Sequence, residues 1–143
     1  MKRLIFFAII LLVPAFGAGY YYQDNTHHKY TDDARRVVTL TPQRKHHILY
    51  GDNKGGGHLH GIGKPCKSEF PKDWNVEKII RTTERIAAND NLDWDAQGNG
   101  YYVAESNEDD VRVRVVLGPQ RQHIITAYPV NVERNPCPTK KNN

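Results

Sequence analysis

The sequence predicts an α+β domain, with helices first and an antiparallel β-sheet meander after them. Between Val76 and Ala87, apolar residues recur at intervals of three and four, which is the spacing of one helix face. Between Val111 and Leu117, valines alternate with arginines, which is the period of a strand with one buried face. The helical pattern precedes the strand patterns instead of alternating with them, and this order favours α+β over α/β.

Two helices are expected, and each has a local start signal. Thr41 can cap the first, Pro42 suits its first position and Gly51 suits its end, so the helix should cover residues 42–50. Asn75 is a natural N-cap for the second helix, "VEKIIRTTERIA" (76–87). Its charged residues face away from the apolar side, so one face should pack on a core.

The period changes to two after Gly98. The segments "GYYVAE" (100–105) and "VRVRVVL" (111–117) are typical of strands, and "GPQ" (118–120) is typical of a turn. A third strand, "HIITAYPV" (123–130), then returns. Short connections between successive strands predict a meander.

The N-terminus has the layout of a secretory signal peptide. A basic "MKR" precedes the apolar run Leu4–Val13, and "PAFGAG" supplies small residues and helix breakers. We expect cleavage after Gly17, or else after Gly19, which places the domain in the periplasm or outside the cell with no stable membrane association. The alternative is an uncleaved anchor, because no charge occurs between Leu4 and Tyr22.

The chain of 143 residues has length for one domain. We expect a linker or loosely docked arm over 18–40, a monomeric domain over 41–137 and a disordered tail over 138–143. Removing Lys2 and Arg3 with the signal peptide lowers the net charge from +4 to +2. Charge alone therefore neither selects nor excludes a nucleic-acid partner.

Cys66 and Cys137 are the only cysteines. An even count in an exported chain indicates a disulfide, and two free thiols or a Cys/His metal site are the alternatives. A disulfide closing so long a loop contributes about 4 kcal/mol in the chain-entropy account. It would pin the C-terminal tail to the loop beside the histidines described next.

Four of the seven histidines lie in "HHILYGDNKGGGHLHG" (46–61), around three consecutive glycines. Histidine exchanges a proton near neutral pH, and glycine lets the backbone approach a ligand closely. The stretch therefore indicates proton-transfer chemistry beside a substrate loop. A polar surface loop is one alternative. Another is a metal site built from the four histidines, His46, His47, His58 and His60.

Four segments resemble, in order, the EndoU endoribonuclease family and specifically its small bacterial toxin branch. They are "HILYGDNKGGGH", "GIGKPCKSEFP", "WNVEKIIRTTERIA" and "IITAYP", and the resemblance extends over residues 46–131. It implies a small ribonuclease-toxin fold and cleavage of single-stranded RNA, preferentially at uridines. In that reaction the ribose 2′-hydroxyl attacks the adjacent phosphorus and leaves a 2′,3′-cyclic phosphate. A base, an acid and donors to the anionic phosphorane are required.

The resemblance implies roles for individual residues. His47 and His58 match the two catalytic histidines, with His58 as base and His47 as acid. Thr126 and Tyr128 match the positions on the final strand, where period two places them on one face. Thr126 would donate to the scissile phosphate, and Tyr128 would orient the ribose or stack on the base.

The third catalytic position is a lysine in animal and viral members of the family, and Lys67 or Lys64 would fill it here. Cys66 lies in the same loop where the family commonly has a small residue, so its disulfide looks like a lineage-specific brace. The remaining expected substrate-binding residues are Gly56, Gly57, Arg112 and Arg114. The glycines would offer backbone N–H groups to the sugar–phosphate. The arginines would line a phosphate path, or else form a solvated strand face.

The function implied is that of an exported endoribonuclease, a toxin or effector that acts on RNA in another cell. Its producer would need an immunity protein as a partner. The transesterification needs no metal, so we expect none in the site, and Mn²⁺ is left as an optional cofactor because some family members need it. The alternatives are a catalytically silent RNA- or partner-binding domain and a histidine-based metal-binding protein.

Overall fold

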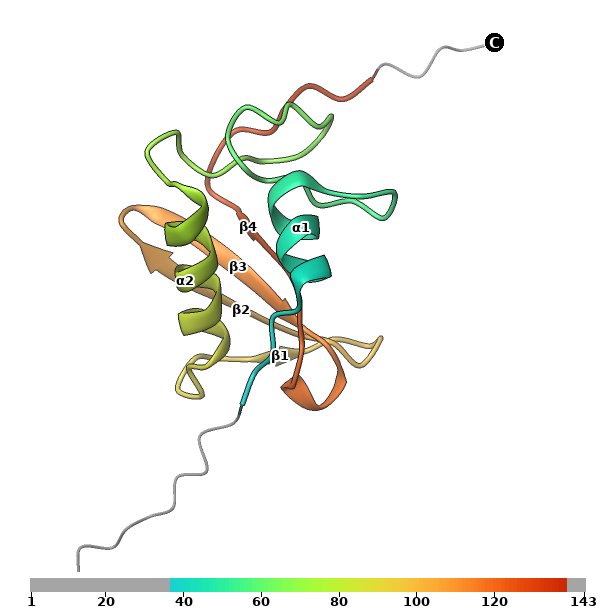
Figure 1. The fold of residues 1–143 in the computed structure, drawn as a ribbon. Coiled ribbons are helices and arrows are strands. Elements are labelled where there is room, and N and C mark those ends of the chain that lie inside the picture. The colour runs from blue at the N-terminus through green and yellow to red at the C-terminus, as the bar shows by residue number, and fades with distance from the viewer. Residues whose placement is uncertain (1–36, 139–143) are drawn as a thin grey trace, which may run out of the picture. The chain divides into compact units, whose positions relative to one another are not determined.

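Both predicted helices form, in a computed structural model that describes residues 37–138 (Figure 1). Helix α1 runs from Pro42 to Tyr50; Thr41 Oγ1 accepts the Arg44 N–H, and Gly51 follows as the C-cap. Helix α2 runs from Val76 to Ala87, and the Asn75 side chain accepts the Lys78 N–H. The capping residues therefore set the helix starts as predicted. Within the described range neither helix is long and apolar enough to cross a membrane.

The predicted meander is confirmed. Four antiparallel strands lie in the order β1 (Asp95–Ala96), β2 (Tyr102–Glu108), β3 (Val111–Leu117) and β4 (Ile124–Pro129). Strand β2 starts two residues later than predicted and continues to Glu108, and the two-residue β1 was not expected. Both residues of β1 are exposed, so no alternating pattern marks it. The predicted turn is a 3₁₀ turn, Pro119–Arg121.

The sheet buries one face against both helices, which lie in front of it in Figure 1. Val113, Val115 and Leu117 of β3 are fully buried on that face. Ile48 of α1 and Ile79 of α2 belong to the same core. The intervening residues of β3 and β4 project to the other face, where Arg114 is paired with Tyr128 across the strands.

The chain just before α1 is docked on the domain. Thr39 pairs with His123, and its carbonyl oxygen accepts the Ile124 N–H at 3.0 Å. Val38 and Leu40 pack against the core. The end of the arm predicted over 18–40 is therefore part of the folded unit. The predicted signal peptide, the rest of the arm and residues 139–143 lie outside the described range.

Candidate active site

The glycine run folds the loop after α1 back onto the C-terminal end of that helix. Gly55, Gly56 and Gly57 all have positive φ, of 126°, 72° and 83°. A Cβ on Gly56 would lie 1.9 Å from the His47 carbonyl oxygen, so only glycine fits there. The Gly57 N–H donates to that same oxygen at 3.0 Å, and the His58 N–H donates to the Ile48 carbonyl at 2.8 Å. The loop thus satisfies the last carbonyls of α1 and carries His58 back to the helix end that holds His47.

One expected role is wrong as a result. The Gly57 N–H bonds inside the fold, so it does not serve as a backbone donor to phosphate. Gly57 is therefore needed to close the loop onto the C-terminal end of α1, and not to contact a ligand.

His47 is oriented by a carboxylate. Its Nδ1–H donates to Asp52 Oδ2 at 3.0 Å, and the Lys54 backbone N–H donates to Asp52 Oδ1 at 2.7 Å. The hydrogen bond from His47, with the bond from Lys54, lowers the pKa of Asp52, so this carboxyl is ionised at neutral pH. An ionised carboxylate keeps a proton on Nδ1, which leaves Nε2 as the nitrogen that can exchange a proton with a ligand.

His58 is oriented by a backbone carbonyl instead. Its Nδ1–H donates to the Ser68 carbonyl oxygen at 2.7 Å, and its ring stacks on Tyr128 with centroids 5.3 Å apart. Burial lowers the pKa of His58 although the Ser68 bond opposes the shift, and the positive charge of Lys67 adds to it. The side chain is therefore neutral at pH 7. Because a carbonyl oxygen only accepts, Nδ1 holds the proton and Nε2 carries the lone pair of a base.

The two histidines open on a common pocket of about 270 Å³. Three cations line it, Lys54, Lys67 and Arg134, and we refer to them as the pocket cations. No Asp or Glu side chain lines this pocket, and no salt bridge within residues 37–138 involves a pocket cation. A polar pocket with unpaired positive charge is suited to an anionic ligand.

All five residues predicted as catalytic meet there. They are His47, His58, Lys67, Thr126 and Tyr128, and the predicted Gly56 lines the same pocket. Lys64 does not reach it, because its Nζ donates to the Asp52 carbonyl oxygen at 3.2 Å. Of the two candidate lysines, the geometry therefore favours Lys67.

The sequence was compared with models of known protein families. The family model for bacterial EndoU nucleases matches residues 60–131, which make up half of the chain and include α2 and all four strands. The chain belongs to the bacterial EndoU nuclease family. The match contains Thr126 and Tyr128 and begins two residues after His58. No curated protein and no solved structure matched the chain.

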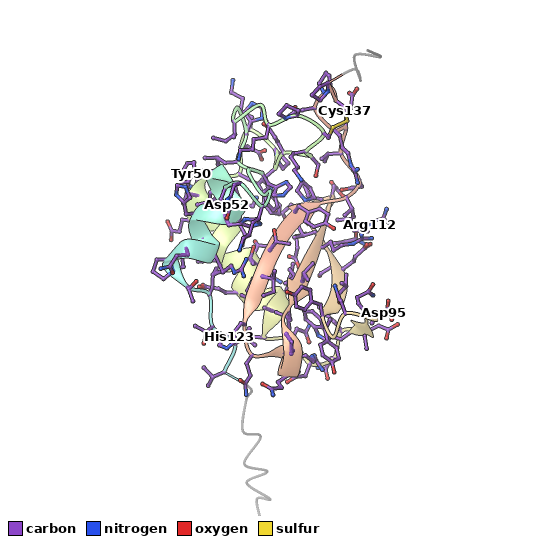
Figure 2. All side chains as sticks on the ribbon, turned by 90° about the vertical axis from the view of Figure 1, so that its right-hand side faces the viewer. Tyr50, Asp52, Asp95, Arg112, His123 and Cys137 are labelled. Atoms are coloured by element: carbon purple, nitrogen blue, oxygen red, sulfur yellow. A yellow bond between two sulfur atoms is a disulfide. The ribbon has the colours of Figure 1, made fainter. Side chains whose placement is uncertain are left out.

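The predicted arginine path is not part of the EndoU pocket. Arg112 Nε lies 3.4 Å from Glu105 Oε2, and Arg114 Nε donates to Glu105 Oε1 at 2.8 Å. Arg114 faces Glu105 on β2 and Tyr128 on β4, with its guanidinium carbon 5.9 Å from the Tyr128 ring centroid. Figure 2 shows Arg112 and Asp52 on opposite sides of the strands. Neither arginine lines the pocket, because the opposing carboxylate on β2 holds both.

Sequence reasoning missed several residues of the EndoU site. Asp52 had a signal, since it follows His47 by five residues, directly after the glycine that ends α1. Ser68 acts through its backbone carbonyl, which leaves no mark in the sequence. Lys54 and Arg134 reach the pocket from outside the regular elements, and only the folded chain reveals them.

The predicted disulfide is confirmed and borders the EndoU pocket. Cys66 and Cys137 are bonded across a separation of 71 residues, and no free cysteine is present in the chain. This excludes the free-thiol and Cys/His metal alternatives. Cys66 itself lines the pocket, so the bond anchors the C-terminal segment at its rim.

The histidine metal site is not formed. Within residues 37–138, no three His, Cys, Asp or Glu side chains are grouped so that they could hold a metal ion. His46 packs on Tyr50, with ring centroids 5.2 Å apart, and His60 Nδ1 lies 4.0 Å from Glu69 Oε2. These two histidines face other partners than His47 and His58 do.

Proposed function

We propose that this EndoU nuclease is an endoribonuclease that cuts single-stranded RNA by internal transesterification. One observation carries the proposal: two histidines line a common cationic pocket and are prepared for opposite roles. His58 is buried, neutral and bonded through Nδ1 to a carbonyl, whereas His47 is bonded through Nδ1 to an ionised carboxylate. General acid–base catalysis needs such a pair.

The proton transfers follow from these contacts. His58 Nε2 removes the proton of the ribose 2′-hydroxyl, and the oxygen attacks the adjacent phosphorus. As the bond from phosphorus to the 5′-oxygen breaks, His47 gives its Nε2 proton to that oxygen. Asp52 stabilises the positive charge that His47 carries before this step. The products are a 2′,3′-cyclic phosphate and a free 5′-hydroxyl.

Other pocket residues supply binding. Lys67 lies beside the histidines and stabilises the negative charge on the phosphorane, and Thr126 donates to a phosphate oxygen. Tyr128 already stacks on His58, and its half-buried ring is placed to contact the ribose or an unpaired uracil. No step draws on a metal ion, and Mn²⁺ acts at most as an accessory.

The location and partner belong to the same proposal. A disulfide at the site is compatible with an oxidising compartment, as expected of a periplasmic or secreted protein. RNA is a cytosolic substrate, so we propose a toxin or effector that reaches another cell, with an immunity protein that protects the producer.

The experiment is a cleavage assay on short single-stranded RNA, in EDTA and in Mn²⁺. His47→Ala and His58→Ala should each lower kcat by about 10²- to 10⁴-fold, the usual contribution of a general acid or base. His123→Ala is the matched control, since His123 lies at the opposite end of the domain from the disulfide (Figure 2). Intact RNA with the wild type, together with measurable RNA binding, would favour the catalytically silent domain instead.

A further inference from the structure

The segment after β4 brings a cation into the pocket from beyond the matched family region. That region ends at residue 131, and Arg134 lines the pocket together with Gly55 and Gly56 of the glycine loop. No salt bridge within residues 37–138 involves its guanidinium, whereas Arg85 is paired with Glu108 and Arg114 with Glu105. Arg134 is therefore an exposed cation that lines the same pocket as the histidines and has no carboxylate partner in the described part of the chain.

A short antiparallel ribbon places Arg134 there. Ser68 and Arg134 form an isolated bridge, and the Asn135 N–H donates to the Lys67 carbonyl oxygen at 2.8 Å. In return, the Cys66 N–H donates to the Asn135 carbonyl oxygen at 3.1 Å. The segment that contains Arg134 is thus paired with the segment that contributes Lys67 and the Ser68 carbonyl to the site.

Two further links hold the ribbon together. The Cys66–Cys137 bond closes it three residues beyond Arg134. The Asn135 side chain donates to the Lys64 carbonyl oxygen at 3.0 Å and to Glu69 Oε1 at 3.1 Å. Beyond Asn131, the segment has no strand of the main sheet to support it, so these contacts decide where Arg134 lies.

We propose that Arg134 binds a backbone phosphate of the RNA and that the Cys66–Cys137 disulfide positions it to do so. The inference rests on the proposed function, and it adds a binding residue and a redox dependence to that site. A guanidinium suits the role because its planar set of donors matches two phosphate oxygens at once.

The redox dependence follows from the covalent link. A dithiol such as dithiothreitol reduces the bond with two electrons: the S–S bond breaks, Cys66 and Cys137 become thiols, and the dithiol closes to its own cyclic disulfide. The segment then keeps only its hydrogen bonds, and Arg134 is no longer fixed over the pocket. RNA binding should weaken, while the core between helices and sheet stays intact.

The first test measures binding of an RNA oligonucleotide whose uridines carry hydrogen in place of the 2′-hydroxyl, so that no cleavage occurs. Arg134→Ala should weaken binding about tenfold, since hydrogen bonds to charged groups are worth that much. It should also reduce the slope of log K against log salt by about 0.7, the value for one phosphate contact on a single strand. Arg134→Lys should keep the salt slope and lose part of the affinity. The control is Arg81→Ala, an exposed arginine of α2 paired with Glu77.

The second test asks whether the disulfide acts through Arg134. Cys66→Ser/Cys137→Ser should weaken binding several-fold when Arg134 is present and have little further effect in the Arg134→Ala background, because coupled residues are not additive. Asn135→Ala keeps the disulfide but removes other contacts of the same segment. It should also weaken binding only when Arg134 is present, and it replaces the serine variant if that variant does not fold.

The possible negative results can be told apart. Equal binding by Arg134→Ala and Arg81→Ala would overturn the role of Arg134. Additive losses would overturn the positioning by the disulfide. If the wild type neither binds nor cleaves RNA, the proposed function itself fails. If it cleaves RNA and Arg134→Ala cleaves equally well, only this inference fails.

Discussion

Positive charge is placed in two ways in this molecule. The pocket cations, Lys54, Lys67 and Arg134, have no carboxylate partner within residues 37–138. The cations of α2 and β3 are each held by one, as Lys78 is by Asp109 at 2.8 Å and Arg112 is by Glu105 at 3.4 Å. A paired cation gives little to an incoming phosphate, because it must first leave its partner.

The difference explains why net charge says little about this protein. A value of +4 describes the whole sequence, whereas anion binding depends on where charge is left unpaired. The rim of the pocket is such a place, and the histidines lie within it. Equal losses of charge in the two regions should therefore have very unequal effects on RNA cleavage.

The largest contrast should come from removing two charges at once. Lys54→Ala/Lys67→Ala should lower kcat/KM on RNA by about 10²-fold or more, since each charge-assisted bond is worth roughly tenfold. Lys45→Ala/Arg81→Ala removes the same charge from exposed pairs with Glu84 and Glu77. That control should stay within about threefold of the wild type, as surface pairs contribute little. Similar losses in both variants would show that binding depends on total charge.

A smaller loss should follow when His47 loses its orienting charge. Asp52→Asn keeps the size of the side chain but no longer fixes the proton on Nδ1, so kcat should fall about tenfold to a hundredfold. Single-turnover kinetics at saturating RNA would measure this step without a contribution from binding. Unchanged kcat would mean that His47 is held by packing alone or is not the acid.

The pH profile tests the state of His58 directly. Its working form is neutral, and burial lowers its pKa from the ordinary value of 6.5. On the acid side, activity should therefore fall only as the pH drops through that lowered pKa. The acid limb of kcat/KM should have its midpoint below 6.5. Lys67→Ala should move the midpoint upward, because the charge of Lys67 contributes to the shift. A midpoint above 6.5 would contradict the assignment of His58 as the base.

The smallest effect is expected on β3. Arg112→Ala should change kcat/KM by less than about twofold, as is usual for exposed side chains away from a site. Arg112 would gain a role only if the RNA crossed the open face of the sheet. A loss as large as that of Lys67→Ala alone would show such a path, and the comparison between the two regions would then fail.

Local signals predicted the helices well. Thr41 and Asn75 satisfy N–H groups of their own helices, so neither helix start depends on distant residues. The alternation of Val111–Leu117 likewise specified β3 and its buried face. Strand β1 could not be found, because two exposed residues show no period and form a strand only by pairing with β2.

The residues of the candidate site likewise fall into those that the sequence predicted and those that it did not. The resemblance found the residues carried by short motifs, His47, His58, Thr126 and Tyr128, and the structure places them around one pocket. The errors and omissions came from contacts that no sequence motif marks. Glu105 reaches Arg114 only through the register of β2 with β3, and Arg134 reaches the pocket only through a ribbon closed by the disulfide.

The most direct test of the central claim uses a DNA oligonucleotide with a single ribouridine. If the two histidines perform transesterification, the wild type will cut only after that residue, and mass spectrometry will find a 2′,3′-cyclic phosphate and a 5′-hydroxyl. The same oligonucleotide with deoxyuridine at that position will remain intact. Cleavage of the all-deoxy strand, or a 5′-phosphate product, would contradict the account, because neither outcome is reached by attack of a 2′-hydroxyl.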